Sequence, residues 1–482
     1  MRTHSGLLVL TLALGATSCT VGPDYVQPKV DTPSSFRFAQ PGAVDLANSA
    51  WWEQFQDPVL NQLISVALQE NKDVQIAAAR VDAFRGQFET TRSQLFPQVG
   101  SNASAERERA SEVGPTPLAG SGPVFKQYQA NLSVAWELDL FGKLRRQTEA
   151  ARASLLASEE GRRGAILSLV ASVASSYINL RDLDRQLAIT NATVASRSEA
   201  VKVFSQRFAG GVVSQMELAQ SQSEYEAALA IAPQIQAQIA QQENALSVLL
   251  GRNPGPILRG RELSDLKQVA VPSGLPSDLL IRRPDLAEAE QNLIAANALI
   301  GAARAQYFPT ISLTGFLGSL SAQSADLFTG PAKVWSYAAN VSLPIFTAGG
   351  IGGQVKQAEA QQQEALLQYQ KSIQVAFQET EDALIGLQKN REQLVTQGRQ
   401  VEALRTYAHL ARLRFDGGYT SYIEVLDAER SLFNAELSYA QTEGTVYTSL
   451  VNLYKAMGGG WVVEADRMTA KAAPPEAAQA KP

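Results

Sequence analysis

Two long segments without proline, 143–208 and 350–415, constrain the fold of this chain more than any other feature. Apolar residues recur in both at a stride of seven, with one break at Thr380. The stride consists of Ile166, Val173, Leu180, Leu187, Val194, Val201 and Phe208, and then of Leu366, Ile373, Leu387, Leu394, Val401, Ala408 and Phe415. This pattern predicts helices packed side by side as in a coiled coil. At a rise of 1.5 Å per residue each helix would be roughly 100 Å long, so we expect a tube or bundle and not a ball.

A shorter heptad segment follows each long one and is expected to form its partner helix. Leu218, Tyr225, Ala232, Ile239 and Leu246 carry the stride in the first partner, and Val425, Leu432, Tyr439, Val446 and Leu453 carry it in the second. The remaining helix surface is rich in Gln, Ala, Ser and Thr. Because a solid bundle normally needs a wider apolar stripe, this composition favours a hollow wall with water on both sides.

The chain also repeats itself. The motif RSQLFP at 92–97 returns as RAQYFP at 304–309, and RFAGG at 207–211 returns as RFDGG at 414–418. We therefore predict an internal two-fold repeat. The predicted boundaries are a signal peptide at 1–18, a lipidated N-terminal segment at 19–70, a first repeat at 71–250, a Pro/Gly-rich connector at 251–282, a second repeat at 283–457 and a C-terminal segment with a disordered Ala/Pro tail at 458–482.

Each repeat contains two strand candidates. Apolar and polar residues alternate along 127–140 and again along 335–345, whereas 99–108 and 311–320 are weaker candidates. A period of two predicts one oily and one wet face, which a soluble sheet with one buried face would also show. Lipid contact is favoured because the strands reach the ~9–11 residues that cross a bilayer and because aromatic residues lie towards their ends. These residues are Tyr128, Trp136, Phe141, Trp335, Tyr337 and Phe346.

Four strands are too few to close a barrel alone, since the smallest bacterial single-chain barrels need about eight. An open sheet edge cannot persist in lipid, because its backbone polar groups would lack partners. The chain must therefore either bury this sheet or share it with other copies.

The N-terminus has the pattern of a secretory signal. Arg2 precedes the apolar stretch 7–14, which is followed by the small residues 15–18 and then by Cys19. A lone Cys at this place resembles a bacterial lipoprotein site, in which acyl (palmitate) and diacylglyceryl groups are attached to the new terminal residue. Thr20, where some lipoproteins have Asp, favours the outer membrane by the same resemblance. The alternative is an ordinary signal peptide with a bystander Cys19.

Composition argues against several classes of protein. The net charge of −5 offers no basic field for nucleic acid. Cys19, His4 and His409 are the only residues of their types, whereas a Cys/His zinc site needs about four such ligands. Most hydrolytic triads would have to be built on His409. We therefore expect no enzyme, no metal site and no other cofactor.

Several motifs together resemble the outer-membrane factors of tripartite efflux pumps, and most closely the lipoprotein branch that partners resistance-nodulation-division pumps. They are Cys19 to Tyr25, Trp51-Trp52 with Phe55 and Asp57-Pro58, the connector motifs Gly274 to Ser277 and Arg282 to Asp285, and Arg414 to Ala428. The resemblance covers nearly the whole chain.

The resemblance implies an α+β membrane protein that forms a homotrimer. Four β-strands per chain would form a shared twelve-stranded trimeric β-barrel in outer-membrane lipid, continued by a coiled-coil-like helical tunnel, with 19–70 and 251–282 in the equatorial region. Such a duct passively conducts drugs or other small solutes. Its expected partners are a periplasmic adaptor and an inner-membrane resistance-nodulation-division transporter. Nucleic acid is not among the expected partners.

The candidate sites lie at the two predicted helical hairpin turns. Glycine permits the positive φ that ends a helix, and serine caps the next helix. The resemblance implies that these turns are periplasmic tips that contact the adaptor. The tip residues are Gly210, Gly211 and Ser214 in the first turn and Gly417, Gly418 and Ser421 in the second.

The resemblance also places an iris-like gate after the second turn. Ile423 and Asp427 lie four residues apart on one helix face, and Arg430 follows three later. Three copies of Ile423 would make an apolar constriction and three of Asp427 a carboxylate ring, with Arg414 tying the helices to a neighbour. The plainer interpretation of Asp427 is a solvated pair with Arg430. The first-repeat equivalents, Met216 and Gln220, lack the charge.

Two other functions remain open from the sequence. One is an exit duct for type I protein secretion. The other is a lipid-anchored periplasmic coiled-coil scaffold without a pore, which would leave the alternating strands without a role. The sequence does not identify the substrate or the particular pump and adaptor.

Overall fold

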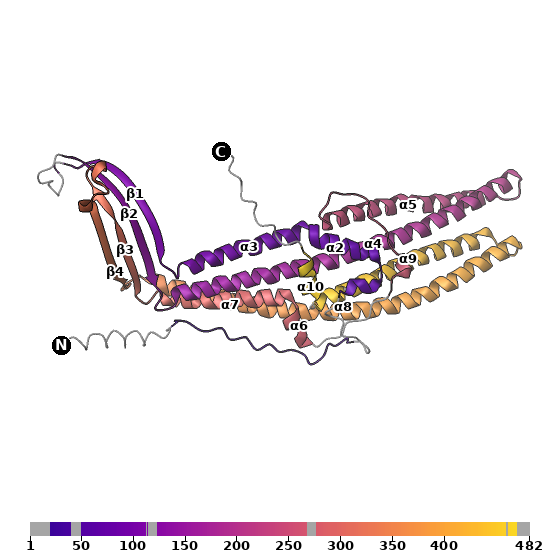
Figure 1. Cartoon of the computed structure of the whole chain (residues 1–482). Helices are drawn as coiled ribbons and strands as arrows, with labels where there is room; N and C mark the ends of the chain where they lie inside the picture. Colours follow the sequence, from indigo (N-terminus) through magenta and orange to yellow (C-terminus); the bar gives the residue numbers. More distant parts are fainter. Residues whose placement is uncertain are drawn as a thin grey trace. The chain divides into compact units, whose positions relative to one another are not determined.

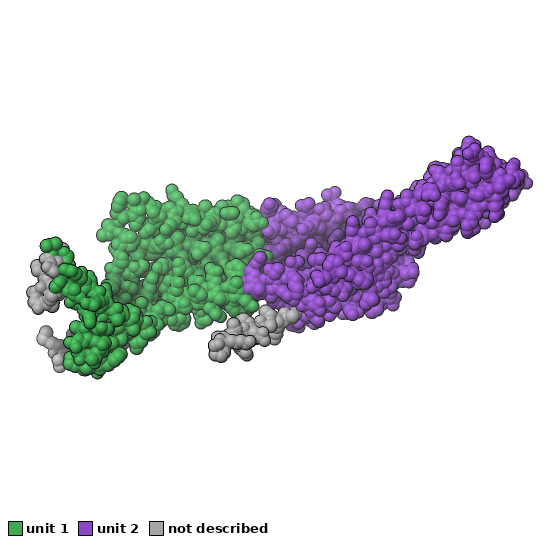
Figure 2. Space-filling model, turned by 90° about the horizontal axis from the view of Figure 1, so that it is seen from above, with its two compact units in different colours: residues 1–29, 81–158, 288–370 green, residues 30–80, 159–287, 371–482 purple. Residues whose placement is uncertain are grey.

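The structure is a computed structural model that describes residues 20–39, 50–111, 113, 123–267, 276–458 and 461–469. The chain consists of two compact units, which Figure 2 shows in green and purple. Unit 1 comprises residues 1–29, 81–158 and 288–370, and unit 2 comprises 30–80, 159–287 and 371–482. Each unit thus contains segments of both repeats. The predicted signal peptide, Cys19 and the Ala/Pro tail after Thr469 lie outside the described residues.

The two long helices form where the heptad stride predicts them (Figure 1). They are α4 (Lys143–Ala209) and α8 (Gly350–Asp416), and their partners are α5 (Gln215–Leu249) and α9 (Tyr422–Ala456). The other helices are η1 (Trp51–Phe55), α2 (Pro58–Glu70), α3 (Lys72–Ser93), η2 (Leu263–Asp265), α6 (Pro276–Arg282), α7 (Pro284–Ala305), η3 (Ser324–Asp326), η4 (Gly330–Ala332) and α10 (Trp461–Met468). Within the described ranges, none of the helices combines the length and the apolarity that a membrane span requires.

The predicted seam is buried over part of its length. Ile166, Val173 and Leu180 of α4 are fully buried, whereas Phe208 is exposed and Phe204 is buried in its place. A straight helix drifts by about 20° per heptad relative to a strict seven-residue repeat, which explains the change of register. The break at Thr380 is also buried, and its hydroxyl donates to the carbonyl of Ala376 at 2.9 Å.

The four predicted strands form one antiparallel sheet in unit 1 with the order β1-β2-β3-β4 (Figure 1). The strands are β1 (Gln98–Arg109), β2 (Val124–Leu138), β3 (Thr310–Ser321) and β4 (Lys333–Ser342). Because β2 pairs with β3, the hairpins of the two repeats join directly. β1 and β4 are left as edges of the sheet within this chain.

The register of the sheet separates an oily face from a wet face. Leu132 pairs with Leu317, which pairs with Trp335. The neighbouring row contains Ser133 and Ser336, with Phe316 between them as an apolar exception. Trp335 and Tyr337 are 67% and 81% exposed, so the chain itself does not cover the oily face. An exposed apolar surface of this kind marks a membrane or protein contact. None of the residues in the four strands is buried, so this chain alone does not form the sheet with one buried face that was the alternative.

The N-terminal segment of unit 1 is held by the residues of its predicted motif. Gly22, at φ +106°, packs so closely on Gly301 that a Cβ would lie 2.3 Å from the Gly301 Cα. The carboxylate of Asp24 accepts from the buried Arg146 at 2.6 Å. The Tyr25 hydroxyl donates to Glu290 at 2.9 Å. Burial and this carboxylate raise the pKa of Tyr25 well above its usual value.

A buried carboxylate organises the core of unit 2. Asp57 accepts hydrogen bonds from the amides of Val59 and Leu60 at the start of α2, and from the amide of Arg261 at 3.0 Å. The Tyr177 hydroxyl donates to the same carboxylate at 2.8 Å. This network fixes the segment after α5 against α2 and α4. The hydrophobic core of the same unit contains packed aromatic rings, with Trp51 stacked on Tyr454 at 5.2 Å between ring centroids.

Helices α4 and α9 approach closely at Asp182. A Cβ added to Gly444 would lie 3.0 Å from the Asp182 Cβ. One carboxylate oxygen of Asp182 accepts from the Gln186 amide at 3.0 Å, while the other is buried without a partner among the described residues. Burial raises the pKa of Asp182 to about 6. Burial and the Asp182 charge also raise the pKa of Glu443, while Arg185 opposes that shift.

We expect Asp182→Asn to stabilise the protein at neutral pH. Because the folded pKa of Asp182 lies above its unfolded value, this carboxyl favours the folded state most at acidic pH and loses that contribution as pH rises to about 6. The variant should gain about 1–3 kcal/mol at pH 7.5 and should flatten the dependence of stability on pH. Thermal unfolding in detergent at several pH values measures both effects.

The control is Asp184→Asn. Asp184 pairs with Arg181 at 2.6 Å and with Arg259 at 3.1 Å, so this variant should be less stable. Equal or lower stability of Asp182→Asn at pH 7.5 would contradict the prediction.

Candidate functional site

The turn between α4 and α5 closes as a Schellman motif. The amide of Gly211 donates to the carbonyl of Phe208, and the amide of Val212 donates to the carbonyl of Arg207, both at 2.9 Å. Gly211 has a φ of +70°, which glycine adopts without strain. The turn between α8 and α9 repeats the motif, with Gly418 at φ +76°. Both turns lie where the sequence predicts them.

The two turns differ in how the next helix begins. Ser214 forms a reciprocal capping box, in which its hydroxyl accepts from the Glu217 amide at 3.2 Å and the Glu217 carboxylate accepts from its amide at 2.8 Å. Ser421 occupies the equivalent position, but its side chain makes no capping hydrogen bond, so that prediction is wrong. Glu424, the residue that would complete the second box, lies 3.7 Å from Arg414 instead.

Three aromatic rings join the two helical hairpins near these turns. Tyr422 of α9 packs on Phe204 of α4 at 4.0 Å and on Phe415 of α8 at 5.1 Å between centroids. Ala411, Val425 and Ala428 are the other buried members of this cluster. Burial raises the pKa of the Tyr422 hydroxyl above its usual value. The cluster fixes the first turns of α9, which carry the predicted gate residues.

Three of the four predicted gate residues lie together. Ile423, Asp427 and Arg430 line one open groove of about 410 Å³, with Gln220 of α5 on the facing wall. Ile423 is 57% exposed, and the Asp427 carboxylate accepts from Arg430 at 2.8 Å. Arg414 is absent from the lining and is near Glu424. Within one chain Asp427 therefore pairs with Arg430, as the plainer interpretation expects. Ile423 and Asp427 are nevertheless both exposed, so their own chain does not cover them.

Sequence reasoning missed one residue that lines this groove and a second residue that pairs with it. Glu224 of α5 lines it, with a carboxylate oxygen 3.9 Å from the Arg430 guanidinium. Arg197 of α4 pairs with the other oxygen of Glu224 at 3.1 Å. No short-range pattern could have found these contacts, because the partners come from separate helices and, for Arg430, from the other repeat.

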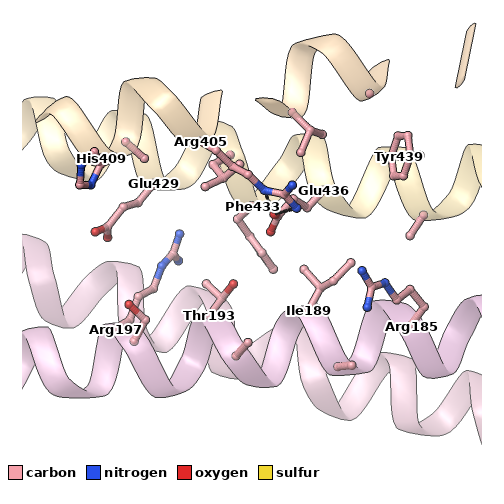
Figure 3. Close-up of a pocket in the computed structure, with 18 of the residues that line it drawn as sticks. Arg185, Ile189, Thr193, Arg197, Arg405, His409, Glu429, Phe433, Glu436 and Tyr439 are labelled. Carbon is pink, nitrogen blue, oxygen red and sulfur yellow. Dashed lines mark hydrogen bonds and ion pairs between the residues drawn. The ribbon is translucent and has the colours of Figure 1, made fainter. Parts of the chain in front are cut away.

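A second groove, of about 710 Å³, lies between α4 on one side and α8 and α9 on the other (Figure 3). Arg405 of α8 pairs with Glu436 of α9 across its upper wall at 2.8 Å. Burial raises the pKa of Glu429, against the charges of Arg412 and Arg197. His409 lies exposed on the same lining. Among the described residues, no group of three or more His, Cys, Asp and Glu side chains could hold a metal ion.

Comparison with known proteins gives consistent matches over both repeats. The model of a family described as outer membrane efflux protein matches residues 63–252 and 275–459. The antibiotic efflux pump outer membrane protein ArpC of Pseudomonas putida is 38% identical over 464 residues, covering 94% of this chain and 95% of ArpC. The cation efflux system protein CusC of Escherichia coli is 34% identical over 461 residues, covering 94% of this chain and 98% of CusC. The solved outer-membrane channel OprN matches with a TM-score of 0.86 and 33% identity, covering 92% of this chain and 100% of OprN.

The unequal caps give a prediction with an internal control. Ser214→Ala removes a capping hydrogen bond and should destabilise the start of α5 by about 1 kcal/mol. Ser421→Ala removes none and should leave the start of α9 nearly unchanged. Hydrogen exchange of the first amides of each helix measures the difference. Equal effects of the two substitutions would show that the caps are equivalent in solution.

Proposed function

This chain belongs to the outer membrane efflux protein family, and from that premise we propose that it is a passive duct closed by a gate of Ile423 and Asp427. It is an outer-membrane exit channel of an efflux pump. The resemblance and the fold class inferred from the sequence are thereby confirmed. The family consists of efflux channels, and the proposed duct carries out no reaction of its own.

In this proposal three copies close the barrel. The oily face of the sheet is exposed, and β1 and β4 each offer an unpaired edge. Pairing of β1 with β4 of a neighbour would satisfy both edges in lipid, which an open sheet cannot do. Three sheets of four strands give twelve strands, more than the ~8 of the smallest closed barrels, and the width of a barrel grows with its strand number.

The gate proposal depends on one observation, which is the exposure of Ile423 and Asp427 on one face of α9. An exposed isoleucine beside an exposed carboxylate has no role in packing a single chain. Around a three-fold axis the three Ile423 side chains would exclude water, and three Asp427 carboxylates would form a ring. Arg430 would offset part of the repulsion within that ring.

The partners proposed for the two tips are the hairpins of a periplasmic adaptor, behind which lies a resistance-nodulation-division transporter. Tyr419 and Val212 are 81% and 76% exposed at these turns. Exposed apolar side chains on a rigid Schellman turn suit docking of another helical end. The other proposed tip residues, Gly210, Gly211, Ser214, Gly417, Gly418 and Ser421, set the shape of the two turns.

The proposed cargo is a class of small solutes rather than folded or secreted protein. The relatives named above are assigned to antibiotic and cation efflux. The wet face of the sheet carries small polar residues such as Asn131, Ser133 and Ser336, which suit passage without strong selection. Selection among solutes would then occur at the pump.

We expect Cys19→Ser to abolish lipid attachment. Cys19 is the only cysteine of the chain, and Thr20, the next residue, packs against Gly142. Cells labelled with radioactive palmitate should incorporate label into the wild-type protein and none into the variant. Label retained by the variant would contradict acylation at Cys19.

We expect the double substitution Ile423→Ala with Asp427→Ala to open the gate, because it removes both the apolar constriction and the carboxylate ring. Single-channel steps in planar bilayers should become several-fold larger, and cells should become sensitive to vancomycin. The matched control is Met216→Ala with Gln220→Ala, at the equivalent positions of the first repeat, which should change the steps little. Unchanged steps in the Ile423 and Asp427 variant would exclude this gate.

A further inference from the structure

A series of alternating charges links α4, α5 and α9 within unit 2. Arg197 of α4 donates to the backbone carbonyl of Glu224 at 2.6 Å and pairs with its carboxylate at 3.1 Å. The second oxygen of that carboxylate lies 3.9 Å from Arg430 of α9. Arg430 in turn donates to Asp427 at 2.8 Å. The series thus begins at a buried cation and ends at the carboxylate of the proposed gate.

The inner end of the series is fixed by burial. The side chain of Arg197 is only 6% exposed, and its guanidinium lies over the Phe433 ring at 5.5 Å from the centroid. Figure 3 shows Arg197 extending from α4 towards α9, with Phe433 and Glu429 on the opposite side. A buried guanidinium requires a charged partner, because leaving it unpaired is strongly unfavourable. Arg197 therefore holds the Glu224 carboxylate at one place.

The outer end of the series is exposed to solvent. The side chains of Arg430 and Asp427 are both about half exposed, and they sit on the same helix. Their mutual pair cannot by itself connect α9 to another helix. Glu224 provides that connection, because it gives the Arg430 guanidinium a second anion on α5. The contact of 3.9 Å is longer than the others in the series, so it is the one that breaks first when α9 moves against α5.

We propose that Glu224 is a positioning residue of the gate, which holds Arg430 and through it Asp427 in the closed arrangement. This inference rests on the gate proposed above. It assigns the first repeat a part in closure, although that repeat has the uncharged Gln220 at the position equivalent to Asp427. In this proposal opening requires loss of the Arg430–Glu224 contact. The buried Arg197–Glu224 pair stays intact, so Glu224 keeps its place beside α4 while α9 moves.

The test uses the full-length protein in planar bilayers, with Glu224→Gln as the main variant. Glutamine keeps the size of the side chain, and Arg197 keeps its hydrogen bond to the backbone carbonyl. The ratio of open to closed dwell times should rise about two- to five-fold, as expected for loss of one partly exposed ion pair. Glu226→Gln is the matched control, since Glu226 is exposed on the same helix and forms none of the ion pairs among the described residues.

A double-mutant cycle distinguishes positioning from general stabilisation. If Glu224 acts through Arg430 and Asp427, Glu224→Gln should add nothing in an Asp427→Ala background. A merely structural role would give the same increment in both backgrounds. Thermal midpoints do not separate the two roles, because Glu224→Gln also removes the charged partner of the buried Arg197. Arg430→Gln tests the same contact from its exposed end and leaves the buried pair intact, so it reports on the contact if Glu224→Gln fails to fold.

The outcomes separate this inference from the gate proposal. Dwell-time ratios of Glu224→Gln equal to those of the wild type, alongside a clear effect of Asp427→Ala, would overturn the role of Glu224 alone. Additive effects would overturn it as well. No effect of Asp427→Ala would remove the gate, and with it the basis for assigning Glu224 a part in closure.

Discussion

A strand at the edge of a sheet has backbone N–H and C=O groups that must find partners, and lipid offers none. The sheet of this chain ends in two such edges, β1 and β4, and its oily face is exposed. Because the backbone groups of these two edges have no partners within the chain, one chain alone cannot form a closed barrel. The same requirement also explains why the strands of the two repeats are joined through β2 and β3, since a single hairpin would be marginal alone.

The two repeats share their backbone design and differ in their charges. Both hairpin turns close with the same Schellman hydrogen bonds and a glycine at positive φ. The first turn adds a capping box at Ser214, whereas in the second turn Glu424 lies near Arg414. The duplication therefore supplies two hairpins with the same backbone turn, and their side chains differ at the position where we propose the gate.

Much of the fold could be predicted because its signals are local. The heptad stride and the glycine turns place the ends of α4 and α8 within one residue of the predicted 208 and 415, because a helix ends where a residue at positive φ is required. Other features depended on partners distant in sequence. The burial of Phe204 in place of Phe208 follows from the drift of a straight helix, and the Glu224 contacts join helices of both repeats.

The sequence by itself determined the main elements of this protein, namely two heptad helical hairpins, two alternating strands with two weaker strand candidates, and their duplication. It could do so because periodicity, turn residues and N-terminal motifs act over a few residues. Only the tertiary structure decided the strand order, the exposure of the oily face and the link from Arg197 through Glu224 to Arg430. Those features depend on which side chains meet across helices, and a carboxylate has a different role beside a buried cation than on a solvated surface.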